Sequence, residues 1–198
     1  MKLGAALVVV VALAAGAPDT RAQARMPQPQ EVARRYAGAV VVVAVAGADR
    51  PESSQGFFVS STGLLCTLLP GAHVGDAVLV SADKVEAGVV VVVDADGLAL
   101  VQVKEAVDVA ALGISSRQRP TRWLVGLARA EAGVQGMLGG VEHQAPDRWR
   151  VMLPLPRGAP ILDDDNDVIA IAVRRLGGGL IDALPVQRLK ALAARLPK

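Results

Sequence analysis

The sequence predicts an all-β domain with a short helix near its beginning and a second helix at its end. Valine is abundant and glycine contributes 20 of the 198 residues, a composition that suits strands joined by tight turns. Short apolar runs recur along the chain between polar or glycine-containing turns, as in sandwiches and barrels. The last segment instead has helical spacing, with Pro185 at its start and apolar residues at Val186, Leu189, Leu192 and Leu196.

The first residues have the pattern of a secretory signal peptide. A basic start, Met1-Lys2, is followed by a wholly apolar or small segment over residues 3–17. Ala22-Gln23-Ala24 then matches the A-x-A cleavage pattern, and the apolar segment is short for a membrane span. We expect residues 1–24 to be removed, which places the mature protein in the periplasm or outside the cell. Retention as an uncleaved anchor is the alternative.

The remainder reads as one domain. Residues 25–30 contain two prolines and form a flexible lead-in, and residues 31–198 are long enough for a proper core. Cys66 is the single cysteine, so no internal disulfide is possible, and its apolar surroundings, GLLCTLL, predict a core position. Lysine and arginine total 21 against 19 acidic residues, with 3% aromatics, which gives no nucleic-acid-binding stripe. No membrane span is expected after signal cleavage.

The individual elements follow from apolar runs and turn residues. The first half predicts a helix, then a strand, then two strands around a Ser-Ser-Thr-Gly turn, one more strand, and two strands around an Asp-Ala-Asp-Gly turn: residues 29–38, 39–47, 54–69, 76–84 and 88–103. The second half predicts short strands and a hairpin with an acidic turn: residues 109–116, 122–130, 133–143, 147–155 and 161–173.

Five segments occur along the chain in an order that matches a known family: EVARRYAGAVVVVAV, GFFVSSTGLLCT, GLALVQV, RGAPILDDDNDVIAI and GGGLIDALPVQRLKALAARL. Together, over roughly residues 31–196, they resemble the trypsin-like serine proteases, most of all the HtrA (Deg) branch of bacterial envelopes. The resemblance implies two six-stranded antiparallel β-barrels with a cleft between them, a short N-terminal helix and a C-terminal helix. No PDZ-type domain is expected after that helix.

The same alignment implies that the catalytic triad is degenerate. The family's histidine position carries Pro70, its aspartate position carries Gly97, and its serine position carries Arg157. Proline offers no base, glycine cannot orient an imidazole, and an arginine cannot act as an acyl-accepting nucleophile. The sequence therefore predicts no catalytic residue.

Displaced catalytic groups are the alternative. His73 would reach the base position only with an insertion and a compensating deletion, and is otherwise a loop histidine. Asp94 or Asp96 could replace the aspartate but suits the turn better. No Ser, Thr or Cys occurs between Trp149 and Ile181, and a histidine with an aspartate cannot perform covalent acyl transfer without a nucleophile.

The resemblance also implies a damaged oxyanion hole. The family uses backbone N–H groups of the nucleophile and of a glycine two residues before it. Here that second position is Leu155, followed by Pro156, where a glycine-dependent turn is disfavoured. Gly158 and Pro160 of the loop remain.

Other candidate sites are weak. Asp163, Asp165 and Asp167 alternate like an EF-hand loop but lack its glycine and final glutamate, so a hairpin turn explains them better. Two histidines and one cysteine give no zinc pattern. Gly177, Gly178 and Gly179 match the glycine stretch beside the family's substrate groove rather than a phosphate loop. Neither a metal nor a cofactor is expected.

These observations predict an exported protease homologue that is inactive and binds a peptide or an envelope protein. Arg157 and Gly158, with the three glycines 177–179, are the candidate binding residues, since a guanidinium in the old cleft could hold a carboxylate and a strand edge can pair with an extended peptide. Alternatively, Arg157 points to solvent or pairs with an acidic neighbour. The alternative functions are an active serine endopeptidase with a displaced triad and a structural envelope β-protein.

Overall fold

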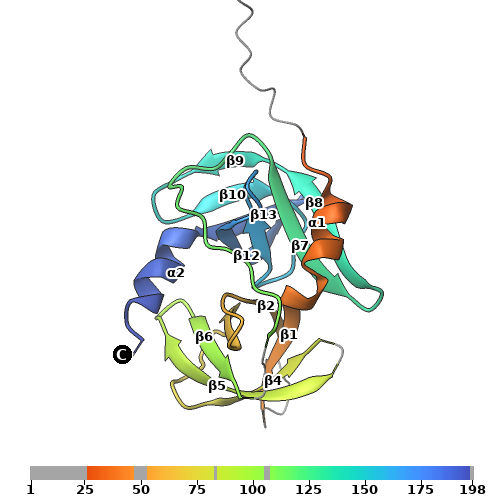
Figure 1. The fold of residues 1–198 in the computed structure, drawn as a ribbon. Coiled ribbons are helices and arrows are strands. Elements are labelled where there is room, and N and C mark those ends of the chain that lie inside the picture. Colours follow the sequence, from red (N-terminus) through yellow and green to blue (C-terminus); the bar gives the residue numbers. More distant parts are fainter. Residues whose placement is uncertain (1–25, 47–52, 83, 105–107, 197–198) are drawn as a thin grey trace, which may run out of the picture.

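The computed structural model describes residues 26–46, 53–82, 84–104 and 108–196. The predicted signal peptide lies outside these ranges. Within them, the chain forms two β-structures stacked one above the other, with both helices on the outside (Figure 1). No helix in the described ranges is both long and apolar enough to cross a bilayer.

The first β-structure is a closed barrel of six antiparallel strands in the order β1-β2-β3-β6-β5-β4. Its strands are β1 (Val40–Val45), β2 (Ser53–Phe58), β3 (Leu64–Leu68), β4 (Ala77–Ser81), β5 (Val85–Val93) and β6 (Leu98–Val103). Alternate residues point inwards and fill the barrel with valine-rich packing, among them Val41, Val43, Leu65 and Val101.

The second β-structure is a seven-stranded sheet in the order β8-β7-β11-β12-β13-β10-β9. Its strands are β7 (Leu124–Ala130), β8 (Gly133–Gly139), β9 (Val141–Gln144), β10 (Trp149–Met152), β11 (Pro160–Leu162), β12 (Val168–Gly177) and β13 (Leu180–Pro185). The two edge strands, β8 and β9, are separated only by Gly140, so one bent segment occupies both edges and the sheet curls round on itself. The predicted double-barrel fold is confirmed, with the difference that the second sheet has seven strands instead of six, and residues 133–143 are divided at Gly140 into β8 and β9.

A further apolar cluster lies between the two barrels and contains residues of both. It contains Phe57 and Leu100 from the first barrel together with Val125 and Leu184 from the second. Leu189 of the C-terminal helix packs into the same cluster. The barrels therefore share a continuous core at the junction where the catalytic positions were expected.

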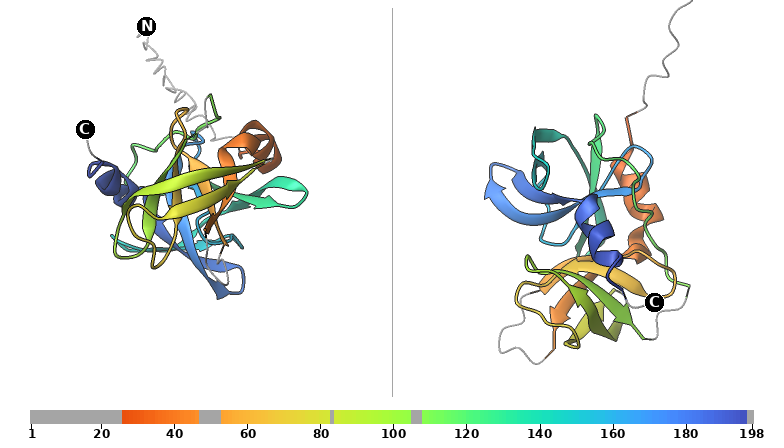
Figure 2. Two further views of the ribbon diagram at one scale, coloured as in Figure 1. Left: turned by 90° about the horizontal axis from the view of Figure 1, so that it is seen from below. Right: turned by 90° about the vertical axis from the view of Figure 1, so that its left-hand side faces the viewer.

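The helices confirm the predicted pair with shorter bounds. Helix α1 spans Pro29–Arg35, with proline at its first turn, and a 3-10 turn, Ala37–Ala39, leads into β1. Helix α2 spans Val186–Ala193 and lies across the junction of the two barrels (Figure 2).

One predicted strand is wrong. Residues 109–116 form no strand, and only Ile114 makes an isolated parallel bridge to Val168. The segment crosses from one barrel to the other, so its backbone bonds go to single positions: Leu112 N–H donates to Phe58 O, and Ser115 N–H to Val168 O. A connection of this kind has the apolar composition of a strand but no neighbour along its length.

Candidate functional site at the barrel junction

Pro70 and Gly97, two of the three residues aligned with the family's triad positions, are in direct backbone contact. The Leu69 N–H donates to the Gly97 carbonyl at 2.7 Å. Gly97 has a φ of +82°, and a Cβ added there would lie 2.7 Å from both the Cα and the N of Pro70. Glycine at position 97 is therefore required by the conformation and by the packing, which leave no room for a carboxylate side chain.

The two aspartates near Gly97 belong to its turn. The Oδ1 atom of Asp94 accepts hydrogen bonds from the N–H groups of Asp96 at 2.9 Å and Leu98 at 3.0 Å. Arg188 of α2 donates to the Oδ2 atoms of Asp94 at 2.8 Å and Asp96 at 2.7 Å. These carboxylates fix the turn and hold the helix, and among the described residues neither carboxylate is hydrogen-bonded to an imidazole.

The two histidines lie on different barrels. His73 follows Pro70 in an exposed loop, and its side chain is 85% accessible. The backbone N–H of His73 donates to the Asp76 carboxylate. Its Nδ1 lies 3.8 Å from the same carboxylate. His143 lies on β9 at the outer surface of the second barrel. In the part of the chain that the structure describes, neither imidazole is hydrogen-bonded to a hydroxyl or thiol group.

The loop that carries Arg157 connects β10 to β11 and rests against the first barrel. The Arg157 carbonyl accepts hydrogen bonds from the Gln55 N–H at 2.8 Å and from the Ser54 hydroxyl at 3.2 Å. The next residue, Gly158, has a φ of +79°, and a Cβ there would collide with the Gln55 carbonyl oxygen. Arg157 is thus placed at the contact between the barrels by a turn that needs glycine after it.

Gln55 connects this loop to the rest of the junction. Its carbonyl accepts the Thr67 hydroxyl at 2.7 Å, three residues before Pro70. Its side-chain amide exchanges two hydrogen bonds with the backbone of Arg129 on β7, at 2.6 and 3.1 Å. Gln55 is a site residue missed from the sequence, although a glutamine within a run of buried strand residues indicates a polar partner in the folded protein.

The hydroxyl and thiol groups near the junction serve structural roles. Thr67 is fully buried and donates to a carbonyl, and Ser54 likewise donates to carbonyl oxygens. Burial raises the pKa of the Cys66 thiol far above its usual value, and the charge of Asp94 raises this pKa further. A buried thiol held protonated is not a nucleophile, and Cys66 occupies the core, as predicted.

The amide that would complete an oxyanion hole is already bonded. The Leu155 N–H donates to the Leu153 carbonyl at 2.9 Å, and Pro156 has no N–H to offer. The Leu155 side chain is buried, and Gly126 opposite leaves room for it. Arg175 reaches from β12 to the same segment, where its Nε and Nη2 donate to the carbonyls of Leu155 at 3.3 Å and Pro154 at 3.2 Å.

The glycine stretch forms the turn between β12 and β13. Gly177, Gly178 and Gly179 have φ values of +96°, +60° and +81°, and all three are exposed. A Cβ at any of them would meet nothing within 4 Å. These glycines therefore allow the left-handed backbone of the turn. The contacts of the Arg157 carbonyl described above are made by Gln55 and Ser54.

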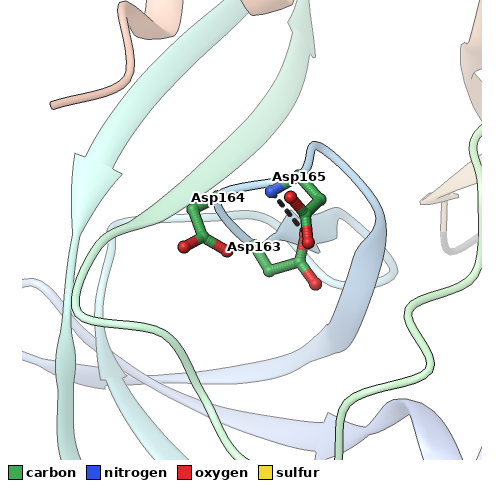
Figure 3. A group of neighbouring side chains, drawn as sticks. All are labelled: Asp163, Asp164 and Asp165. Atoms are coloured by element: carbon green, nitrogen blue, oxygen red, sulfur yellow. Dashed lines mark hydrogen bonds between the residues drawn. The ribbon is translucent and has the colours of Figure 1, made fainter. Parts of the chain in front are cut away.

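The acidic turn between β11 and β12 is the hairpin turn that the sequence predicts, and its three consecutive carboxylates are shown in Figure 3. Buried Asp163 accepts the N–H groups of Asp165 and Asp167 at 3.0 and 3.1 Å and the Ser115 hydroxyl at 2.5 Å. Arg117 lies within 4 Å of Asp163, Asp164 and Asp165. A single guanidinium therefore offsets part of the negative charge of these three carboxylates, and neutral donors satisfy the buried Asp163.

Comparison with known proteins gives a consistent result. No protein-family model matches the sequence, and no curated protein matches it. A serine endoprotease from Yersinia pestis superposes with a TM-score of 0.69 at 14% identity, covering 85% of this chain and 66% of its own. The chain thus spans slightly less than two thirds of that protein.

The Rv3671c protease from M. tuberculosis is also similar. Its active form gives a TM-score of 0.68 at 15% identity, covering 86% of this chain and 88% of its own. Its inactive form gives 0.66 at 16% identity, covering 87% and 98%. Identities this low define the fold alone: the chain has the double-barrel fold of the trypsin-like serine proteases.

Proposed function

We propose that this chain is an exported protein with a protease fold that does not cleave peptide bonds and instead binds an extended peptide or a segment of an envelope protein. The observation that carries the proposal is the junction itself. Our alignment assigns Pro70, Gly97 and Arg157 to the positions of base, orienting acid and nucleophile. Among the described residues, neither imidazole is hydrogen-bonded to a hydroxyl or thiol group that could replace them.

Covalent acyl transfer needs a nucleophile in hydrogen-bond contact with a general base. In the described residues, the hydroxyls of Ser54 and Thr67 donate to carbonyl groups, and the Cys66 thiol is fully buried in the core. The Leu155 N–H is bonded to the Leu153 carbonyl, so the developing negative charge of a tetrahedral intermediate would lack one of the two backbone donors of an oxyanion hole. Each missing part supports inactivity independently.

The binding role is supported by the way β12 is paired. β11 accompanies β12 as far as Ile171, and Ala172 still exchanges backbone bonds with Gly158 and Ala159. Beyond this point, β12 pairs only with β13 in the described part of the chain. A strand with one unpaired side can accept an extended peptide through main-chain hydrogen bonds.

Export is the third part of the proposal and rests on the leader-like residues 1–24. It is tested by expressing the full chain in a bacterial host and sequencing the N-terminus of the periplasmic fraction. The expected result is a mature protein that begins near Arg25. Full-length protein that stays with the membrane fraction would instead indicate an anchor.

Activity is tested with a fluorophosphonate probe, which labels activated serines, and with a fluorescent casein substrate, using trypsin as the positive control. The expected result is no labelling and no hydrolysis, together with measurable binding of labelled extended peptides. Labelling that disappears in His73→Ala would establish a displaced triad and refute inactivity. Absence of both activity and peptide binding would leave the structural envelope role.

A further inference from the structure

The outer face of the second barrel carries a groove of about 500 Å³ whose lining is dominated by arginine. The residues that line it with polar groups are His143, Arg148, Arg150, Arg174 and Asp182. They come from β9, β10, β12 and β13 and the turn between β9 and β10, which lie together at the top of the molecule in Figure 1. This groove is distinct from the junction that contains Arg157.

Strand register places these side chains in one row. His143 is the partner of Arg150, Arg150 is the partner of Asp182, and Asp182 is the partner of Arg174. Directly paired residues of antiparallel strands project on the same face with Cβ atoms close together. The row therefore crosses four neighbouring strands and ends at Arg174, on the β12 segment that pairs with β13 alone.

The groove contains more positively charged than negatively charged side chains. Three guanidinium groups face a single carboxylate, and that carboxylate is already committed, since Asp182 accepts from the Arg174 Nε at 2.8 Å. Among the described residues, neither Arg148 nor Arg150 has an ion-pair or side-chain hydrogen-bond partner. Guanidinium groups prefer carboxylates or phosphates as planar, bidentate partners.

One of these arginines, Arg174, is held in place before any ligand arrives. The Asp182 side chain is only 10% exposed and binds the Arg174 guanidinium. The backbone of Arg148 is fixed by a tight turn in which the Ala145 N–H donates to the Arg148 carbonyl at 3.0 Å, although this bond does not orient the Arg148 guanidinium. Preorganised donors lose less side-chain entropy on binding than mobile surface arginines do.

We propose that this groove binds the carboxylates of an acidic peptide segment, an inference that rests on the peptide-binding function proposed above. Arg150 and Arg174 are two strands apart, a backbone separation of roughly 10 Å. The side chains at alternate positions of an extended peptide lie on one face about 7 Å apart, a span that long arginine side chains can meet. A single small anion would contact only one end of the row.

The test measures fluorescence anisotropy with two labelled peptides that differ only in charge. One carries glutamate at two alternate positions, and its twin carries glutamine there. The mature protein is compared with Arg150→Gln, which removes one guanidinium without removing a partner. Arg195→Gln, an exposed arginine at the end of α2 and outside the groove, serves as the matched control. Inorganic phosphate is the competing small anion.

The expected result is that the glutamate peptide binds roughly tenfold tighter than the glutamine peptide, as expected for the loss of charge-assisted contacts. Arg150→Gln should remove this preference, and Arg195→Gln should keep it. Equal binding of both peptides would overturn the acidic preference and leave the peptide-binding function standing. Phosphate binding that depends on Arg150, without binding of either peptide, would overturn the inference in favour of a small-anion site. Absence of all binding would overturn both proposals.

Discussion

Replacement of Gly97 by alanine isolates the packing between this residue and the backbone of Pro70. The φ of +82° alone makes alanine unfavourable by about 1–2 kcal/mol. The added Cβ would also lie 2.7 Å from two backbone atoms of Pro70 and 2.9 Å from the Leu69 carbonyl carbon. Backbone atoms cannot rotate away as side chains do, and overpacking of this kind costs about 1–3 kcal/mol more.

Gly71→Ala is the matched control. Gly71 has a nearly identical φ of +79°, and its Cβ would meet nothing within 4 Å. The conformational penalty and the reduced entropy of the unfolded chain are therefore common to both variants and cancel in the comparison. Gly97→Ala should be less stable than Gly71→Ala by about 1–3 kcal/mol, or roughly 3–10 °C in Tm for a domain of this size.

Urea denaturation of the mature protein and both variants measures this difference, provided that the slope of the transition is unchanged. Because the contacts are with the backbone of Pro70, the added substitution Pro70→Ala should not rescue Gly97→Ala. Equal stability of the two glycine variants, or rescue by Pro70→Ala, would show that the backbones of positions 70 and 97 are not packed as described.

Three further predictions concern neighbouring features. Burial, together with the charge of its acidic neighbours, raises the pKa of Asp167, so its charged form is disfavoured in the folded state. Asp167→Asn should therefore raise the Tm at neutral pH, and the gain should fade as the pH falls through that raised pKa; a gain that persists at about pH 3 would contradict this reasoning. Arg188→Ala should destabilise the domain by about 1 kcal/mol, since it breaks two ion pairs to the 94–97 turn, whereas Arg195→Ala should change little in the same urea titration. Cys66 should react with a maleimide only when denaturant unfolds the barrel, because its side chain is fully buried; rapid labelling of the native protein would exclude the core assignment.

The turns and the terminal helix could be predicted from the sequence because the residues that determine each of them lie close together in the chain. The acidic turn at Asp163 and the turn at Asp94 were predicted from residue types that bond to their own backbone, and both do so. The terminal helix followed from apolar spacing over a few residues. The strand predicted over residues 109–116 was wrong because composition alone does not say whether an apolar segment has neighbours to pair with.

The features that sequence reasoning missed depend on strand register between distant segments. Gln55 contacts Arg129 across 74 residues of sequence, and although a glutamine in an apolar strand suggests a buried polar partner, the sequence does not identify Arg129 as that partner. The row from His143 to Arg174 exists only because four strands align in one register. A shift of one residue in any of these strands would turn its side chain to the opposite face, so the groove is a property of the assembled sheet.

We expect that restoring three side chains would not turn the junction into a protease site. A carboxylate at position 97 would need the backbone of Pro70 to move away. A donor for an oxyanion would need the Leu155 N–H to leave Leu153. The Arg175 guanidinium would also have to release the carbonyls of Pro154 and Leu155, which it binds together. Since these are three separate structural changes, the triple variant Pro70→His, Gly97→Asp, Arg157→Ser should show no hydrolysis of casein. Detectable hydrolysis by that variant would show that the three side chains alone separate this chain from an active protease.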